Sequence, residues 1–168
     1  QLNDNDTLLT RSLGQTFMHD RNQLRKIVGL AKLNDADRVI EIGPGLGPLT
    51  ELLLDTAGQV TAIETDLRLA KQLEERLGQR DNFTLQHADA MKLVRNAEFD
   101  WSGHKLVANL PYSIASPLLI DLAALDGRPS AMVVTLQLEV VQRLLAQPAT
   151  KEYGVLTLLI GLHYASGE

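Results

Sequence analysis

The chain has 168 residues, of which 45% are hydrophobic, and this size and composition suit one globular domain with a sizeable core. It contains no cysteine, which excludes disulfide bonds and thiol chemistry and fits a reducing, cytoplasmic location. The net charge of −5 argues against strong nonspecific binding of nucleic acid. No apolar run reaches the roughly 18 residues that a membrane-spanning helix needs, so we expect no membrane span.

Residues 1–10 are polar and are predicted to form a flexible arm, and residues 11–168 are predicted to form the domain. Helical spacing of apolar residues predicts helices over 21–33, 48–55, 67–78, 116–125, 138–146 and 155–162. Candidate N-caps are Asp20, Asp66 and Ser116, the last followed by Pro117 at the first helical position. Short apolar runs predict strands over 39–42, 60–63, 83–86, 105–108 and 131–136. This alternation predicts an α/β fold with a doubly wound, mostly parallel sheet.

A glycine-rich turn, Gly43-Pro44-Gly45-Leu46-Gly47, follows the first predicted strand. Glycines let the backbone approach a ligand closely because they lack Cβ, and the next helix offers unpaired N–H groups. The pattern predicts a loop for a nucleotide-like cofactor, and the alternative is a purely structural turn. Glu64 ends the second predicted strand about 20 residues further on, where a ribose-binding acid is usual. The glycine spacing departs from the G-x-G-x-x-G dinucleotide fingerprint, which leaves an NAD-dependent oxidoreductase as a weaker alternative.

The segment Asn109-Leu110-Pro111-Tyr112 follows the fourth predicted strand and is the catalytic candidate. An exocyclic adenine amine is a poor nucleophile, because its lone pair is delocalised into the ring. The Asn109 side-chain oxygen and the Leu110 carbonyl can accept hydrogen bonds from both N–H groups of such an amine. Pro111 stiffens the turn, and Tyr112 offers a face on which a base can stack. The alternative is a proline turn with a core tyrosine.

These unusual segments all follow predicted strands. The glycine turn follows the first strand, Glu64 ends the second, Asp89 follows the third, and Asn109–Tyr112 follows the fourth. In doubly wound sheets, ligands bind at the carboxyl ends of the strands, where the strand order reverses. We therefore expect one crevice to contain all four segments, and the spatial strand order to be third, second, first, fourth, fifth.

The motifs together resemble those of the KsgA-type small-subunit rRNA adenine N6-dimethyltransferases, relatives of the erythromycin-resistance rRNA methyltransferases. The resemblance runs from about Arg11 to Tyr164. It rests on Gly14-Gln15-Thr16-Phe17-Met18, Glu41-Ile42-Gly43-Pro44-Gly45-Leu46-Gly47-Pro48-Leu49-Thr50, Ile63-Glu64-x-Asp66, Asp89-Ala90, Asn109-Leu110-Pro111-Tyr112, Leu136-Gln137-x-Glu139-Val140 and Tyr153-Gly154-x-Leu156.

The resemblance implies a Rossmann-like methyltransferase that uses S-adenosylmethionine as methyl donor and needs no metal. It implies dimethylation of two adjacent adenines in a small-subunit rRNA hairpin during ribosome assembly, by a monomer without membrane contact. By motif, cofactor binding is assigned to Gln15, Thr16, Met18, Glu41, Gly43, Gly45, Glu64, Asp89, Ala90 and Asn109. The target adenine is assigned to Asn109, Leu110, Pro111 and Tyr112.

The chain departs from this family in three respects. Thr16 and Met18 replace the usual Asn and Leu, and Leu138 stands where a Lys is common. The family's final strand pair, its Phe-x-Pro loop and its small helical RNA-binding domain are absent, so we expect a longer protein and a fifth strand at the sheet edge. The alternatives are a large-subunit rRNA methyltransferase of the macrolide-resistance type and a non-catalytic ribosome-assembly or transcription factor.

Overall fold

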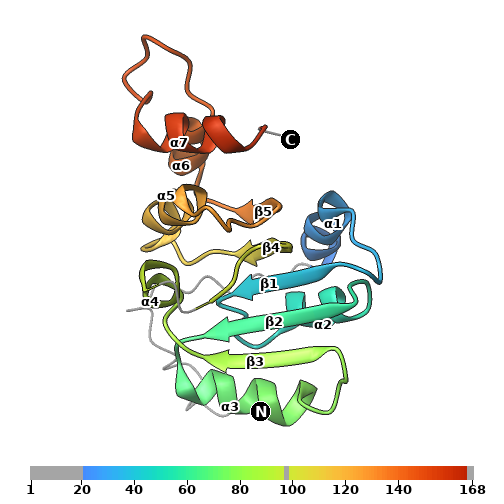
Figure 1. Ribbon diagram of the computed structural model, residues 1–168. Helices are drawn as coiled ribbons and strands as arrows, with labels where there is room; N and C mark the ends of the chain where they lie inside the picture. The colour runs from blue at the N-terminus through green and yellow to red at the C-terminus, as the bar shows by residue number, and fades with distance from the viewer. Residues whose placement is uncertain (1–20, 97–98, 166–168) are drawn as a thin grey trace, which may run out of the picture.

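The computed structural model describes residues 21–96 and 99–165, and five parallel strands form one sheet in this part of the chain (Figure 1). The strands are β1 (Arg38–Ile42), β2 (Gln59–Glu64), β3 (Phe83–His87), β4 (His104–Asn109) and β5 (Ala131–Thr135). Their spatial order is β3-β2-β1-β4-β5, so the predicted order and the doubly wound parallel sheet are confirmed. Predictions that fall on residues 1–20, including Asp20 as an N-cap, lie outside the described residues.

Helices cover both faces of the sheet (Figure 1). They are α1 (Arg21–Ala31), α2 (Pro48–Leu54), α3 (Leu67–Leu77), α4 (Ala90–Arg95), α5 (Ala115–Ala124), α6 (Leu138–Leu144) and α7 (Val155–His163). Because successive strand residues point to opposite faces, Val39 packs with α1, α2 and α3, whereas Ile40 packs with α4 and α5. The sheet thus has a core on each side. Within the described ranges, no helix has the length and apolarity needed to cross a membrane.

One helix was not predicted, and one predicted N-cap is wrong. Helix α4 was not predicted, because its six residues are too few to show a helical period. Ser116 is not the N-cap of α5: the helix begins at Ala115 after Ile114, and no side chain caps it. Pro117 therefore occupies the third helical position, where its missing N–H costs little because the first-turn N–H groups have no helical partner.

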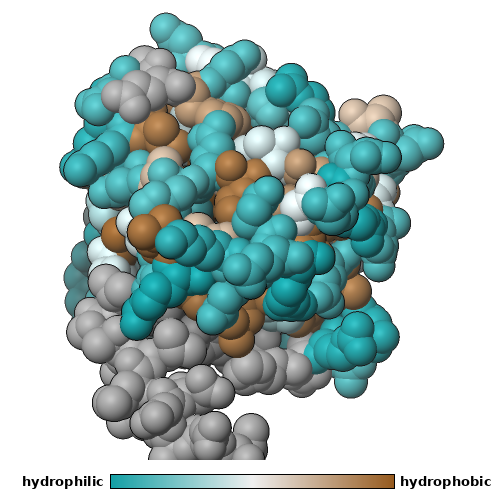
Figure 2. Space-filling view, turned by 90° about the horizontal axis from the view of Figure 1, so that it is seen from below, coloured by the Kyte–Doolittle hydropathy of each residue, from teal (hydrophilic) through white to brown (hydrophobic). Residues whose placement is uncertain are grey.

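On the face of the molecule that carries α3 and β3, hydrophilic residues predominate. Figure 2, seen from the side of α3 and β3, shows apolar residues scattered between polar ones on this face. Helix α3 follows this division, since Leu69, Leu73 and Leu77 are buried and its other side is charged. Asp66 caps the helix as predicted, because its carboxylate accepts from the Arg68 backbone N–H at 2.8 Å.

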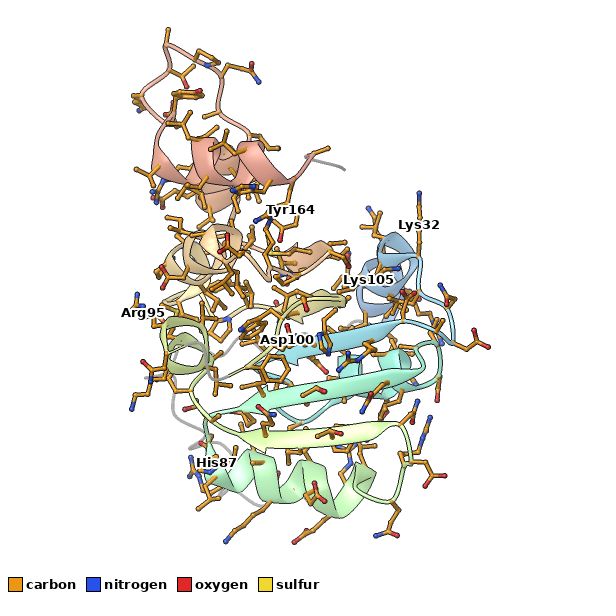
Figure 3. All side chains as sticks on the ribbon, in the orientation of Figure 1. Lys32, His87, Arg95, Asp100, Lys105 and Tyr164 are labelled. Atoms are coloured by element: carbon orange, nitrogen blue, oxygen red, sulfur yellow. The ribbon has the colours of Figure 1, made fainter. Side chains whose placement is uncertain are left out.

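A lysine from β4 connects the end of α1 to the loop before β1. The ammonium of Lys105 lies 3.0 Å from an Asp37 carboxylate oxygen, 3.2 Å from the Lys32 carbonyl and 3.4 Å from the Ala31 carbonyl. Figure 3 shows Lys105 beside the C-terminal end of α1. The carbonyls in the last turn of a helix lack helical partners and favour a cation, so Lys105 stabilises this end of α1.

We expect Lys105→Met to lower the free energy of unfolding by about 1–2 kcal/mol at pH 7, because the Asp37 carboxylate and the α1 carbonyls lose a half-buried donor. The hydrogen bond from Lys105 lowers the pKa of Asp37 below 3.8. A lowered pKa contributes stability above the unfolded value, and this contribution is lost as pH falls through the folded value. The deficit of the variant should therefore shrink below about pH 4. Urea unfolding of the full-length protein at pH 7 and pH 3 measures it.

The matched control is Lys151→Met, because the Lys151 side chain is 92% exposed and lies 3.6 Å from Glu152. This change should alter stability by less than about 0.5 kcal/mol. Equal effects of the two substitutions would contradict a specific role for Lys105.

Candidate active site

A cavity of about 400 Å3 opens at the carboxyl ends of β1, β2 and β4 and beside the loop after β3. It contains the predicted site residues of all four segments, so the predicted crevice is confirmed. Those lining it are Glu41, Gly43, Gly45, Glu64, Asp89, Ala90, Asn109, Leu110, Pro111 and Tyr112. The remaining three, Gln15, Thr16 and Met18, lie outside the described residues.

The glycine turn is a left-handed backbone segment that closes against the loop after β4. Gly43, Gly45 and Gly47 have φ angles of 69°, 59° and 83°, which L side chains rarely adopt. A Cβ on Gly43 would lie 3.4 Å from the Pro111 ring, and one on Gly47 would lie 2.4 Å from a Leu73 methyl group. A Cβ on Gly43 would thus only touch Pro111, and its positive φ is what favours glycine there, whereas a Cβ on Gly47 would also displace Leu73 where α2 begins close to α3.

Glu64 holds this turn in place from the end of β2. Its side chain is only 1% exposed, and a buried carboxylate needs donors. One oxygen accepts from the Gly45 backbone N–H at 3.2 Å, and the other accepts from the Asp66 backbone N–H at 2.9 Å. Each carboxylate oxygen has about two lone-pair directions, so Glu64 can still accept from a ligand.

Glu41 lies in the same cavity without such donors. It is 2% exposed, and among the described residues its Oε2 atom has no hydrogen-bond partner. Burial raises the pKa of Glu41 to about 8, the Thr50 hydroxyl opposes this change, and the negative charge of Glu64 adds to it. A buried polar atom without a partner marks a place where a ligand or water donates.

Asp89 belongs both to the cavity lining and to the start of α4. It lines the cavity, and its carboxylate caps α4 by accepting from the Met91 backbone N–H at 2.9 Å. Asp89 was predicted as a site residue, but the short helix that it caps was not predicted.

The segment after β4 divides into buried and accessible residues. The Leu110 side chain is 2% exposed and belongs to the core, whereas Tyr112 is 42% exposed at the cavity. The Pro111 carbonyl accepts from the Ile114 N–H at 3.1 Å and completes a turn that leads into α5. The Oδ1 atom of Asn109 accepts a hydrogen bond from the Thr135 hydroxyl. This arrangement presents a polar side chain and an aromatic face to one space.

Two further residues contribute to the site and were missed. Arg76 of α3 lines the cavity and donates to the Leu46 carbonyl and to Glu51, so it braces the end of the glycine turn. Thr135 of β5 contacts Asn109 from outside the cavity. An isolated arginine in a charged helix or a threonine at a strand end carries no motif, so the sequence offered no signal for either.

Comparison with known proteins gives the family. The family model described as "Ribosomal RNA adenine dimethylase" matches residues 7–165. A curated relative from Corynebacterium diphtheriae, "Ribosomal RNA small subunit methyltransferase A", is 47% identical over 155 residues, which cover 89% of this chain and 52% of that protein.

Two solved structures are similar in fold and sequence. A dimethyladenosine transferase from Plasmodium falciparum has a TM-score of 0.73 and 31% identity, over 84% of this chain and 50% of that chain. The 23S rRNA methyltransferase ErmE has a TM-score of 0.66 and 34% identity, over 76% and 50% respectively. The chain spans about half the length of these proteins. Nearly all of the sequence matches the family model, and the chain belongs to the ribosomal RNA adenine dimethylase family.

Proposed function

We propose that the protein transfers methyl groups from S-adenosylmethionine to the N6 atoms of two adjacent adenines in a small-subunit rRNA hairpin. It acts as a monomer on the assembling subunit in the cytoplasm. The observation that carries this proposal is that one cavity joins the glycine turn and Glu64 to the Asn109–Tyr112 segment. A donor site and an acceptor site for methyl transfer must be adjacent, because the reacting atoms have to meet in line.

The cofactor half of the cavity suits a nucleoside with a cationic tail. Glu64 can accept hydrogen bonds from ribose hydroxyls on the lone pairs that the Gly45 and Asp66 amides leave available. Glu41, whose Oε2 atom has no partner among the described residues, lies near the turn as a further acceptor. Asp89 and Ala90 line the cavity beyond Glu64, where they can contact the base of the cofactor.

The acceptor half holds the amine and its ring. Asn109 and the Leu110 carbonyl accept from the two N–H bonds of the amine, which keeps its lone pair directed at the methyl donor. Tyr112, 42% exposed, can stack on the flipped base. When bound, S-adenosylmethionine supplies a methyl group on a sulfonium: the N–C bond forms as the C–S bond breaks, leaving a thioether. The amine proton passes to solvent, because an amide oxygen is not a base.

The small subunit is the preferred substrate over the large subunit. The relative from Corynebacterium diphtheriae carries a small-subunit name at 47% identity, whereas ErmE is 34% identical. Single-turnover methyl transfer by the full-length protein to pre-assembled small subunits tests this choice directly. Transfer to large-subunit RNA instead would support the macrolide-resistance type, and transfer to neither would support a non-catalytic assembly factor.

Glu64→Ala should weaken the binding of S-adenosylmethionine by about 1–3 kcal/mol, because charge-assisted hydrogen bonds to hydroxyls are lost. Isothermal titration calorimetry measures the affinity, and Glu75→Ala on the exposed side of α3 is the matched control. Unchanged affinity in a folded Glu64→Ala protein would remove Glu64 from the cofactor site. Equally tight binding of NADH by the unmodified protein would favour an oxidoreductase.

Asn109→Ala should slow methyl transfer by at least about tenfold, because a positioned polar group in a preorganised site is lost. Cofactor affinity should change little. Tyr112→Phe should be mild because the stacking face remains, and Tyr112→Ala should cost about 1–3 kcal/mol in transition-state stabilisation. Single-turnover rates of methyl transfer to pre-assembled small subunits measure the effects of these three substitutions. A wild-type rate for Asn109→Ala would make the segment a structural turn only.

Glu41→Gln should flatten the pH dependence of stability. The pKa of Glu41 is raised to about 8 in the folded protein from 4.5, so its contribution is fully present below about pH 4.5 and is lost as pH rises through 8. The unmodified protein should therefore lose stability between pH 5 and pH 9, and the glutamine variant should lose less. Thermal unfolding across this range measures the difference, with Glu75→Gln as control. Parallel curves for Glu41→Gln and the unmodified protein would refute the raised pKa.

A further inference from the structure

Asn109 and Thr135 are the last residues of β4 and β5, and the parallel register pairs them directly. Side chains at paired positions of neighbouring strands lie on the same face and about 5 Å apart at Cβ. The Thr135 hydroxyl donates to the Oδ1 atom of Asn109. Both residues are half-buried, so this hydrogen bond is only partly exposed to competition from water.

Thr135 reaches Asn109 from outside the active-site cavity. Asn109 lines the cavity that holds the glycine turn, whereas Thr135 lines a second cavity of about 780 Å3 between β5, α1 and the last two helices. Asn109 therefore belongs to the lining of the first cavity, and Thr135 does not. Thr135 is therefore placed to affect methyl transfer through the Asn109 side chain, to which its hydroxyl donates.

The orientation of an asparagine amide needs such a partner. The terminal torsion of the side chain is broad and roughly two-fold, so its oxygen and its NH2 group readily exchange places. An NH2 group that faced the target amine would bring donor against donor. The oxygen has two lone pairs, and a donor on one leaves the other for an amine N–H.

We propose that Thr135 is a positioning residue of the acceptor site. Its hydroxyl holds the Asn109 amide with Oδ1 at the strand end, ready to accept from the target amine. This inference rests on the proposed function, because it assigns Asn109 to that amine. Thr135 itself lies outside the lining of the cavity that we assign to the base and the cofactor.

The central test is Thr135→Val in the full-length protein, since valine keeps the β-branched shape and removes only the hydroxyl. Single-turnover transfer to pre-assembled small subunits should be about tenfold slower, because the acceptor group is misoriented for part of the time. The KM for subunits and the affinity for S-adenosylmethionine should stay within about twofold. Thr135→Ser, which retains the hydroxyl, should restore most of the rate.

The matched control is Thr61→Val. Thr61 is a 7% exposed threonine of β2 that does not line the active-site cavity, so its valine variant should transfer methyl groups at the wild-type rate. A Thr135→Val protein that transfers as fast as this control would overturn the proposal. A rate loss that Thr135→Ser does not restore would overturn it as well.

A double-mutant cycle shows whether Thr135 acts through Asn109. In an Asn109→Ala background, Thr135→Val should have no further effect, because the group that it orients is gone. Additive losses would mean an independent role and would refute the proposal. If the unmodified protein transfers no methyl group to adenine in rRNA, the proposed function itself has failed, which is a different outcome.

A readout without cofactor or substrate completes the test. In nuclear magnetic resonance spectra, the side-chain NH2 signal of Asn109, identified by its loss in Asn109→Ala, should be rigid in the unmodified protein. It should become mobile in Thr135→Val and remain rigid in Thr135→Ser. An equally rigid signal in all three proteins would refute the orienting role, and Thr135→Ala provides a second variant if valine impairs folding.

Discussion

The site depends on one buried carboxylate. Glu64 is only 1% exposed, and a carboxylate buried to this extent is tolerated only if donors surround it. The donors are backbone amides from the glycine turn and from the start of α3, which belong to different loops. Each loop is thereby bound to the end of β2, and the left-handed turn between β1 and α2 has one defined position.

The two carboxylates of the cavity differ because their surroundings differ. Glu64 has backbone donors, whereas Glu41 is buried without one among the described residues, and its pKa is raised to about 8 by that burial. The two groups lie close enough for the charge of Glu64 to disfavour that of Glu41. Burial and the neighbouring charge of Glu64 both favour the uncharged form of Glu41.

Sequence patterns were sufficient for the strands and for bringing the four predicted segments to one cavity. Buried parallel strands are continuous apolar runs, and their carboxyl ends meet at one edge of the sheet, so Glu64, Asp89 and Asn109 could be placed together. Short and context-dependent features could not be found in this way. Helix α4 has too few residues for a period, and the path of the chain sets where α5 begins. Thr135 meets Asn109 only through strand register, which a shift of one residue would change.

Lys105 of β4, which donates to carbonyls at the end of α1, limits the order in which these elements can form during synthesis. Helix α1 emerges from the ribosome early, but Lys105 lies 73 residues beyond the Lys32 carbonyl that it contacts. The hydrogen bonds from Lys105 to the end of α1 therefore cannot form until most of the sheet has been translated. Leu24 of the same helix lines the cavity. The helix that supplies this part of the cavity wall is therefore stabilised at its C-terminal end only once β4 has been synthesised.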